Sequence, residues 1–353
     1  MSKNPKPFSG HDLDQVLRSI WGFGSTTIVG WRPRERAIEV IAVPTIRLFR
    51  EGEGHPRVFD GARLMGPATF DEVARSLSAQ PLEIRLPQAI EESEFDTIGK
   101  LVSRYSIPRT KRRAVWLIDI VGFSKCSPGQ QASQLASLEF CFNVAGEICR
   151  QQGFALDPAR STTGDGFYLW NRNKGENADT DTFCLGALAL TYLAALRRGT
   201  DDRVYVPRIR ASFDIGSHYN YFELGSHESR GGDFIVGEVT IRLARIIEHA
   251  APEQFLMGDF FHGDTGGEEI PTNGFVDRAA ASLQSFHDLS ILGTPLREFT
   301  LSLAERCLEL VDKHGQVHRC YNAVLTAALG SGASLCLGVS QAPDEEIRGL
   351  ASL

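Results

Sequence analysis

The spacing of apolar residues changes several times along the chain, and each change predicts a different element. A continuous apolar run at 114–120 is typical of a buried central strand. After Pro128, apolar residues such as Leu135 and Leu138 recur at three- and four-residue steps and predict a long helix to about residue 152. Residues 182–197 then predict a second, strongly apolar helix.

The middle of the chain therefore has the order βαββαβ, with further strands after it. This order predicts an α+β fold, in which one sheet is covered by helices. The strands expected after the first are a hairpin around 164–166, 204–215, 219–224, 255–257, 307–311 and 318–324, and the further helices are 237–250 and 272–289.

The first hundred residues carry no motif that can be tied to chemistry. Strands at 26–31 and 38–49 and helices at 69–77 and 91–105 predict a small α/β accessory region. Its role in regulation, dimerisation or structure stays open. We thus expect an accessory region at 1–110, a main domain at 111–326 and, because it is rich in Gly and Ser, a peripheral tail at 327–353.

Composition narrows the possible partners. The 353 residues carry a net charge of −7, so the basic footprint of a nucleic-acid-binding protein is missing. The seven cysteines contain no Cys-x-x-Cys pair, which indicates core residues in a reducing compartment. The N-terminus lacks a signal-peptide core, and no apolar run approaches the roughly 18 residues of a membrane helix. We expect a cytoplasmic protein without direct membrane insertion.

Two aspartates are the main candidates for chemistry. Asp119 ends the apolar strand, and Asp165 lies in the turn Gly164-Asp165-Gly166. Each strand would deliver a carboxylate to a Gly-containing turn, where phosphates could lie against bare backbone. Two carboxylates that converge from neighbouring strands are what a two-metal phosphoryl-transfer site requires.

Four segments, in this order and at this spacing, resemble the class III nucleotidyl cyclase catalytic domain. They are residues 119–124, 164–166, 237–245 and 250–257. The resemblance covers about 110–325 and implies a class III cyclase-type sheet. It also implies that a ribose 3′-oxygen attacks the α-phosphorus, that pyrophosphate leaves, and that two divalent metal ions (Mn²⁺ or Mg²⁺) assist.

The same resemblance assigns the catalytic residues. Asp119, Asp165 and the carbonyl of Ile120 would hold the two metals, and Arg245 would stabilise charge in the transition state. In this family the arginine completes a site in a second subunit, so a homodimer with shared sites is implied. The turn expected to offer backbone N–H groups to the phosphates consists of Val121, Gly122, Phe123 and Ser124.

Two further positions follow from the resemblance. Lys313 falls where the family has a lysine for the terminal phosphates. Ile241 stands where the family has a ribose-orienting asparagine, and isoleucine cannot form that hydrogen bond. Arg242 is adjacent and is the candidate to replace this function, and whether it does so stays open.

The base-reading positions match neither purine code of the family, which uses lysine for adenine or glutamate for guanine. Ser161 stands four residues before Asp165, and Phe234 stands three residues before Gly237. An aromatic ring there can shorten the pocket and favour a single-ring base. The chain is in this respect similar to the pyrimidine cyclases of the bacterial Pycsar anti-phage system, whose product activates a separately encoded effector.

We therefore expect a cyclase that converts UTP to cyclic UMP for anti-phage defence. A cytidylate cyclase that acts on CTP remains open, because nothing in the sequence distinguishes the uracil O4 from the cytosine N4 group. An adenylate or guanylate cyclase with an atypical base pocket and a non-catalytic nucleotide sensor with this fold also remain. Palm-type diguanylate cyclases share the carboxylates, but the arginine helix is not part of their pattern.

Overall fold

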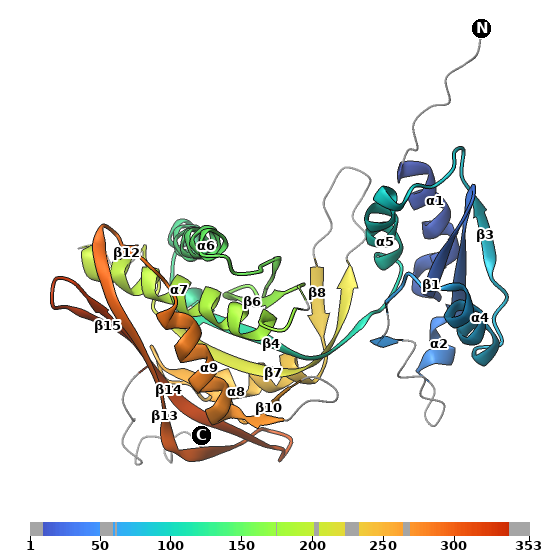
Figure 1. Cartoon of the computed structure of the whole chain (residues 1–353). Coiled ribbons are helices and arrows are strands. Elements are labelled where there is room, and N and C mark those ends of the chain that lie inside the picture. The colour runs from blue at the N-terminus through green and yellow to red at the C-terminus, as the bar shows by residue number, and fades with distance from the viewer. Residues whose placement is uncertain are drawn as a thin grey trace, which may run out of the picture. The chain divides into compact units, whose positions relative to one another are not determined.

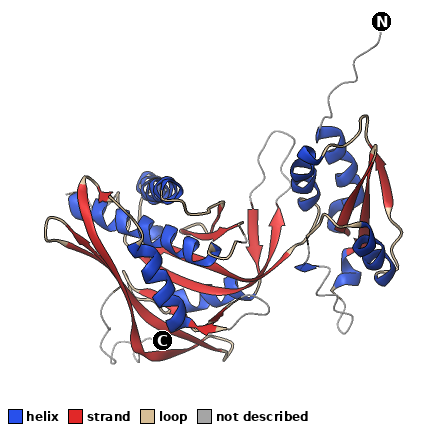
Figure 2. Ribbon diagram, in the orientation of Figure 1, coloured by secondary structure: helices blue, strands red, loops and turns tan. Residues whose placement is uncertain are grey.

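The computed structural model describes residues 10–49, 59–60, 62–173, 175–200, 205–222, 233–263 and 269–338. The chain divides into two compact units (Figures 1 and 2). The first consists of 1–111 together with 219–235, and the second of 112–218 together with 236–353. Residues from the middle of the chain thus join the N-terminal unit, which a simple boundary at 110 does not include.

The first unit is built on a three-stranded antiparallel sheet with the order β1-β2-β3. One face packs against α1 and α5, and the other against α2 and α4, so each face has its own apolar core. Alternate residues supply the two cores: Ile38 and Val40 face one, and Ile41 and Val43 face the other. The bounds are α1 Gly10–Trp21, β1 Thr26–Arg34, β2 Ala37–Pro44, α2 Thr45–Leu48, α4 Pro67–Ser76, β3 Leu82–Arg85 and α5 Phe95–Ser103.

Two elements of this unit, α1 and β3, were not predicted from the sequence. A third difference concerns the strand expected at 38–49, which ends at Pro44 and is followed by the short helix α2. Proline lacks the N–H that a strand would need to continue its ladder, which accounts for the early end.

A ten-stranded sheet, most of whose residues belong to the second unit, has the main order β12-β13-β14-β9-β7-β4-β6-β5, with β15 paired to β14 and β8 to β7. β4 and β6 are antiparallel neighbours, whereas β7 and β9 are parallel. The bounds are β4 Arg109–Ile120, β5 Pro158–Thr162, β6 Gly166–Asn171, β7 Ile209–Phe222, β8 Asp233–Val236, β9 Phe255–Gly258, β12 Ser290–Ile291, β13 Thr294–Val311, β14 Val317–Leu329 and β15 Ser334–Leu337. A separate two-stranded ladder joins β10 Phe261–His262 to β11 Ile270–Pro271.

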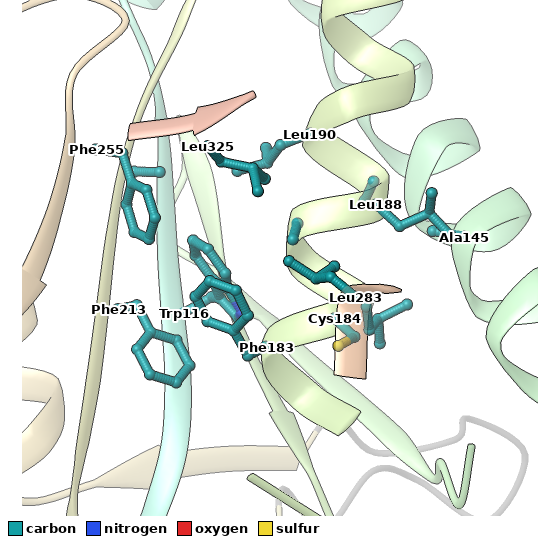
Figure 3. Packing of buried hydrophobic residues seen from close by; sticks show 14 of the residues in the cluster. Trp116, Ala145, Phe183, Cys184, Leu188, Leu190, Phe213, Phe255, Leu283 and Leu325 are labelled. Carbon is teal, nitrogen blue, oxygen red and sulfur yellow. The ribbon is translucent and has the colours of Figure 1, made fainter. Parts of the chain in front are cut away.

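The core of this unit lies between the sheet and helices α6 Pro128–Gln151, α7 Ala178–Gly199 and α9 Thr272–Gln284. Trp116 on β4 is its centre: the ring is fully buried and lies 5.2 Å from Phe183, 5.1 Å from Phe213 and 5.0 Å from Phe255, measured between centroids (Figure 3). The indole N–H donates to the carbonyl of Thr182 at 3.1 Å, so the buried polar atom is satisfied.

Helix α8 Glu238–Glu248 packs against the other face of the sheet. Strand alternation shows this on β7, where Ala211 and Phe213 face the α7 core while Ser212 and Asp214 contact α8. On β4 the same alternation places Trp116 in the core and Asp119 on the α8 side. The α8 side of the sheet therefore carries the polar residues.

The predicted α+β class, with one sheet covered by helices, is confirmed. The prediction and the structure differ in several details, of which three bear on the sheet. The strands expected at 204–215 and 219–224 form one strand, β7, and the hairpin strands β13 and β14 are longer than expected. The segment from 327, expected to be peripheral, completes β14 and supplies β15, whose Leu335 is buried in the core.

Two whole-chain expectations concern membranes and cysteines. Within the described ranges, no helix is long and apolar enough to cross a membrane. All seven cysteines are free thiols, and four of them are buried. Burial raises the pKa of Cys141, Cys149 and Cys320 to about 12, which keeps these thiols protonated and unreactive.

Candidate active site

The two candidate metal aspartates lie on antiparallel neighbouring strands. Asp119, the penultimate residue of β4, is the register partner of Gly166, and the N–H of Ile120 donates to the carbonyl of Asp165 at 2.8 Å. The ladder thus places the backbones of Asp119 and Asp165 side by side. This is the convergence expected from the sequence.

Two glycines make this geometry possible. A Cβ added to Gly166 would lie 1.9 Å from the carbonyl oxygen of Ile118, so β4 and β6 can approach here only if the residue is glycine. Gly122 adopts a positive φ of 72° in the turn after β4. Nothing lies within 4 Å of a Cβ built on Gly122, so the turn borders open space at this residue. The N–H of Val121 is engaged by the carbonyl of Arg208 at 2.9 Å.

The surroundings of Asp119 shift the pKa of its carboxyl in opposite directions. Burial raises the pKa of its carboxyl, the Arg210 guanidinium lowers it, and the nearby Asp165 carboxylate raises it again, with a net upward shift. Arg210 Nε donates to Asp119 Oδ2 at 2.6 Å, and Thr163 Oγ1 lies 3.5 Å from Asp165 Oδ1. Two neighbouring carboxylates with one arginine leave an incompletely balanced negative charge.

The donor set fits hard divalent cations. Carboxylate and carbonyl oxygens are the ligands that Mg²⁺ and Mn²⁺ prefer. Asp119, Asp165 and the Ile120 carbonyl are the candidate donors, and Arg210 occupies one oxygen of Asp119. Over the described ranges, no group of three or more His, Cys, Asp or Glu side chains is placed to hold a metal. A cation here would therefore need oxygen ligands from its substrate or from water.

Arg245 lies on α8 and forms two ion pairs within the chain. Its Nη1 lies 3.0 Å from Glu248 Oε1, and its Nε lies 3.6 Å from Asp312 Oδ2. Asp312 also accepts from the backbone N–H groups of His314 and Gln316 and contacts His318 Nε2 at 3.2 Å. These bonds lower the pKa of Asp312 to about 2, with the Gln316 bond as the largest cause.

Asp312 thus joins Arg245 to the turn between β13 and β14. Lys313 lies exposed in this turn, directly after Asp312. Asp312 therefore fixes Arg245 to the turn that carries Lys313, the other candidate phosphate-binding cation of this unit. Among the described residues, Arg245 forms ion pairs with Glu248 and Asp312, whereas Asp119 pairs with Arg210, so the two groups are separate ion-pair clusters.

Arg242 and Ile241 point in different directions from α8. Arg242 forms a bidentate pair with Asp214, a fully buried carboxylate on β7, and also donates to the Ile215 carbonyl at 3.1 Å. Its guanidinium is therefore already engaged by the sheet. Ile241 is 57% exposed, on the same helical face as Arg245 four residues later.

The two candidate base-reading residues belong to different units. Ser161 is buried on β5 opposite Tyr168, and the Tyr168 hydroxyl donates to the Thr240 carbonyl of α8 at 3.0 Å. Cross-strand pairing places Ser161 on the face of the sheet that carries Asp119. Phe234 lies on β8, in the first unit, and its side chain is 37% exposed.

Three charged residues at this face were not singled out from the sequence: Arg210, Asp214 and Asp312. A signal for the first two exists, since Arg210, Ser212 and Asp214 alternate with apolar residues along β7. A charged residue in the middle of such a strand needs a partner, and both have one. For Asp312 no sequence signal separates it from an ordinary turn residue.

No protein-family model matches the chain, and no curated protein matches it. Solved structures similar to it include the guanylyl cyclase Cya2, at 13% identity over 67% of this chain and 97% of the other, with a TM-score of 0.38. The adenylyl cyclase CyaB from P. aeruginosa has 13% identity over 62% and 96%, with a TM-score of 0.37. The guanylate cyclase domain of RhGC from Catenaria anguillulae, in complex with GTP, has 13% identity over 61% and 97%, also with 0.37. At this identity and these TM-scores, the similarity carries no argument about function.

Proposed function

We propose that this chain is a nucleotide cyclase, which converts a ribonucleoside triphosphate to its 3′,5′-cyclic monophosphate and pyrophosphate. The observation that carries the proposal is the placement of Asp119 and Asp165 at facing positions of β4 and the β5–β6 turn, beside a turn that borders open space. Two carboxylates with one arginine leave the negative charge that a pair of cations would neutralise.

The chain's own residues have distinct tasks in this proposal. Asp119, Asp165 and the Ile120 carbonyl would hold two divalent cations, which lower the pKa of the attacking ribose hydroxyl and neutralise the leaving group when bound. The backbone N–H groups of the turn at Gly122, Phe123 and Ser124 would bind phosphate oxygens. Arg245 would hold the charge that develops at the α-phosphate, and Lys313 the terminal phosphates.

The acting Arg245 would come from a second copy of the chain. Within one chain Arg245 pairs with Glu248 and Asp312 rather than with the metal aspartates, which is compatible with a homodimer that shares its sites. The Arg242 side chain is held by Asp214, so its role in this proposal is to fix α8 on the sheet beside Arg245. The ribose would then have to be oriented without the asparagine that Ile241 replaces.

For the base, we propose a pyrimidine, with UTP preferred and CTP as the alternative. Ser161 offers a single short hydroxyl on the face that carries Asp119, and neither a lysine nor a glutamate that would read a purine stands there. The proposed role in anti-phage defence, through cyclic UMP and a separately encoded effector, rests on the resemblance alone.

The deciding experiment is incubation with ATP, GTP, CTP and UTP, each with Mn²⁺, followed by mass spectrometry of the products. We expect cyclic UMP from the wild-type protein and no product from the Asp165→Ala variant. A cyclic purine as the sole product would end the pyrimidine proposal and leave the cyclase proposal standing. No cyclic product from any triphosphate, with nucleotide binding retained, would favour a sensor.

Shared sites can be tested by mixing two inactive variants. Asp119→Ala and Arg245→Ala proteins should each be inactive, and their mixture should recover up to about a quarter of wild-type activity, because a mixed dimer has one complete site. Mass spectrometry of intact complexes checks that mixed dimers form. Absence of recovery in confirmed mixed dimers would contradict the sharing of sites but not the chemistry.

A second candidate function, a nucleotide sensor without catalysis, is favoured by one observation. Arg210 already occupies Asp119 Oδ2. A stable ion pair of this kind is expected in a protein that needs no metal at this position. Replacement of Arg210 separates the two candidate functions. In a sensor, nucleotide binding by Arg210→Gln would remain independent of Mn²⁺. In a cyclase, Arg210→Gln would change the Mn²⁺ concentration needed for activity.

A further inference from the structure

The second unit contains a cavity of about 440 Å³, and none of the candidate catalytic or metal-binding residues lines it. It lies where the last turns of α7, the start of β7, the residues before β9 and strand β15 meet. Its inner wall is apolar, with Leu190 and Leu193 from α7, Phe255 from β9 and Leu335 from β15. A cavity of this size accommodates a small organic molecule.

The polar lining of the cavity is mostly cationic. Among the described residues that line it, Arg197, Arg198 and Arg208 stand with one acidic residue, Glu253, so these four sum to a formal charge of +2. Glu253 is shared between two of the arginines, at 3.6 Å from Arg208 Nε and 3.9 Å from Arg197 Nε. Arg197 and Arg198 also donate to the backbone carbonyls of Val206 and Ser334. The carbonyls position these guanidinium groups without cancelling their charge.

Two observations distinguish this lining from an ordinary solvated surface. The arginines converge from two elements, α7 and the segment before β7, onto one apolar hollow. Glu253, at the cavity, has a positive φ of 67°, which is unfavourable for a residue with a side chain. Such strain persists only where the surroundings hold it, here by the bond from its N–H to the Ile209 carbonyl at 2.8 Å.

We propose that this cavity is a binding site for a small amphipathic anion, with an apolar body against α7 and β15 and an acidic group between the arginines. Arginine pairs with carboxylates and phosphates through two parallel hydrogen bonds, which suits this task. A bare inorganic anion would leave the apolar wall unused, and a neutral apolar molecule would leave the net positive charge of the lining uncompensated. The ligand class is therefore an organic acid with an apolar body.

The segment 207–211, which includes the start of β7 and lines this cavity, also contacts the candidate active site. The Arg208 carbonyl accepts the N–H of Val121, the first residue of the turn after β4. Arg210, two residues later, donates to Asp119 on the other face of the same strand. A ligand that holds the Arg208 side chain would thus restrain the backbone that supports Val121. Ligand binding in the cavity would in this way reduce the conformational freedom of the turn after β4.

Binding is tested on the full chain by isothermal titration calorimetry with octanoate as the probe, and with octanol and inorganic phosphate as matched single-feature probes. We expect saturable binding of octanoate and at least about tenfold weaker binding of the other two, since each lacks one half of the interaction. Phosphate that binds as tightly as octanoate would overturn the amphipathic class. Absence of saturable octanoate binding at millimolar concentrations would overturn the site.

Single-residue variants test where octanoate binds, and removal of the arginines or of Glu253 should change the affinity in opposite directions. Arg198→Gln and Arg208→Gln should each weaken octanoate binding about tenfold, as loss of one charge-assisted hydrogen bond does, whereas Glu253→Gln should tighten it. Arg319→Gln is the control, because Arg319 is an exposed arginine that pairs with Glu309 and does not line the cavity. Equal affinity in all four variants would place the bound octanoate elsewhere and contradict the proposal.

The link to the turn has its own readout, which does not depend on catalysis. Hydrogen exchange of the Val121 amide should slow at least about threefold when octanoate saturates the wild-type protein, and should not change in Arg208→Gln at the same concentration. Slowing that is equal in both proteins would show that the Arg208 side chain does not carry the effect. A failure of the cyclase proposal would leave both the calorimetry and this measurement unchanged.

Discussion

Asp119 and Asp312 are two carboxylates with the same exposed fraction, 8%, and each has an arginine beside it, yet their pKa values shift in opposite directions. Asp312 accepts two backbone N–H groups and contacts His318, and its pKa falls to about 2. Burial and the neighbouring Asp165 carboxylate raise the pKa of Asp119, although Arg210 lowers it.

The difference shows how to separate a structural carboxylate from a candidate functional one. The bonds to Asp312 come from its own turn, so its charge is stabilised by the fold itself. Asp119 and Asp165 together carry more negative charge than Arg210 neutralises. Such a pair is better matched to an added cation than to the folded chain alone.

The largest expected effect concerns activity. Asp119→Asn should lower cyclase activity by at least about a thousandfold, because the amide cannot replace a metal-binding carboxylate. Asp312→Asn should lower it only about tenfold, through the loosened Arg245 and Lys313. Product formation is measured by mass spectrometry at saturating triphosphate and Mn²⁺, with circular dichroism to confirm folding. Equal losses of cyclase activity in the two variants would show that Asp119 and Asp312 do not differ in function as proposed.

A smaller effect is expected on the thermal stability of the protein with Mn²⁺. A ligand at about a hundredfold excess over its Kd adds about 2.7 kcal/mol to the free energy of unfolding, which corresponds to a rise of about 5 °C in Tm. We expect this rise in the wild type and in Asp312→Asn but not in Asp119→Asn. Scanning calorimetry measures the rise in Tm, with Ca²⁺ as a second cation for comparison with Mn²⁺. A full rise in Asp119→Asn would remove that residue from the metal site.

The smallest effect is the dependence of stability on pH. Because the pKa of Asp312 is lowered to about 2 in the folded state, the unfolded chain binds more protons between about pH 4 and pH 2. The contribution of Asp312 is therefore complete above about pH 4 and is lost as the pH falls through this window. Urea unfolding at several pH values should show a shallower acid loss in Asp312→Asn than in the wild type. Parallel curves would contradict the lowered pKa.

The hydrophobic pattern predicted the order of the main elements because burial on one face imposes the strand and helix periods directly. The run at 114–120 is β4, and the stripe after Pro128 is α6. Strand lengths were not predictable in the same way. The register of β13 against β14 shifts between Leu303 and Cys307, and such an irregularity depends on the partner strand rather than on local sequence.

For the candidate site, the sequence indicated Asp119 and Asp165 because turn glycines flank both. It did not indicate that Asp214 would engage Arg242, since the two residues are far apart in the sequence and meet only when α8 packs on β7. The same holds for Arg210, whose partner Asp119 belongs to another strand. Pairings across the sheet depend on topology, which local patterns do not encode.

The close approach at Gly166 sets a practical limit on the redesign of nucleotide selectivity. Ser161 lies on β5, which ends the strand order of the sheet and pairs with β6, so a substitution there disturbs one ladder. Gly166 pairs with Asp119 and admits no side chain, because Ile118 occupies the space of its Cβ. A mutant library for altered base choice should therefore vary position 161 freely and hold position 166 constant.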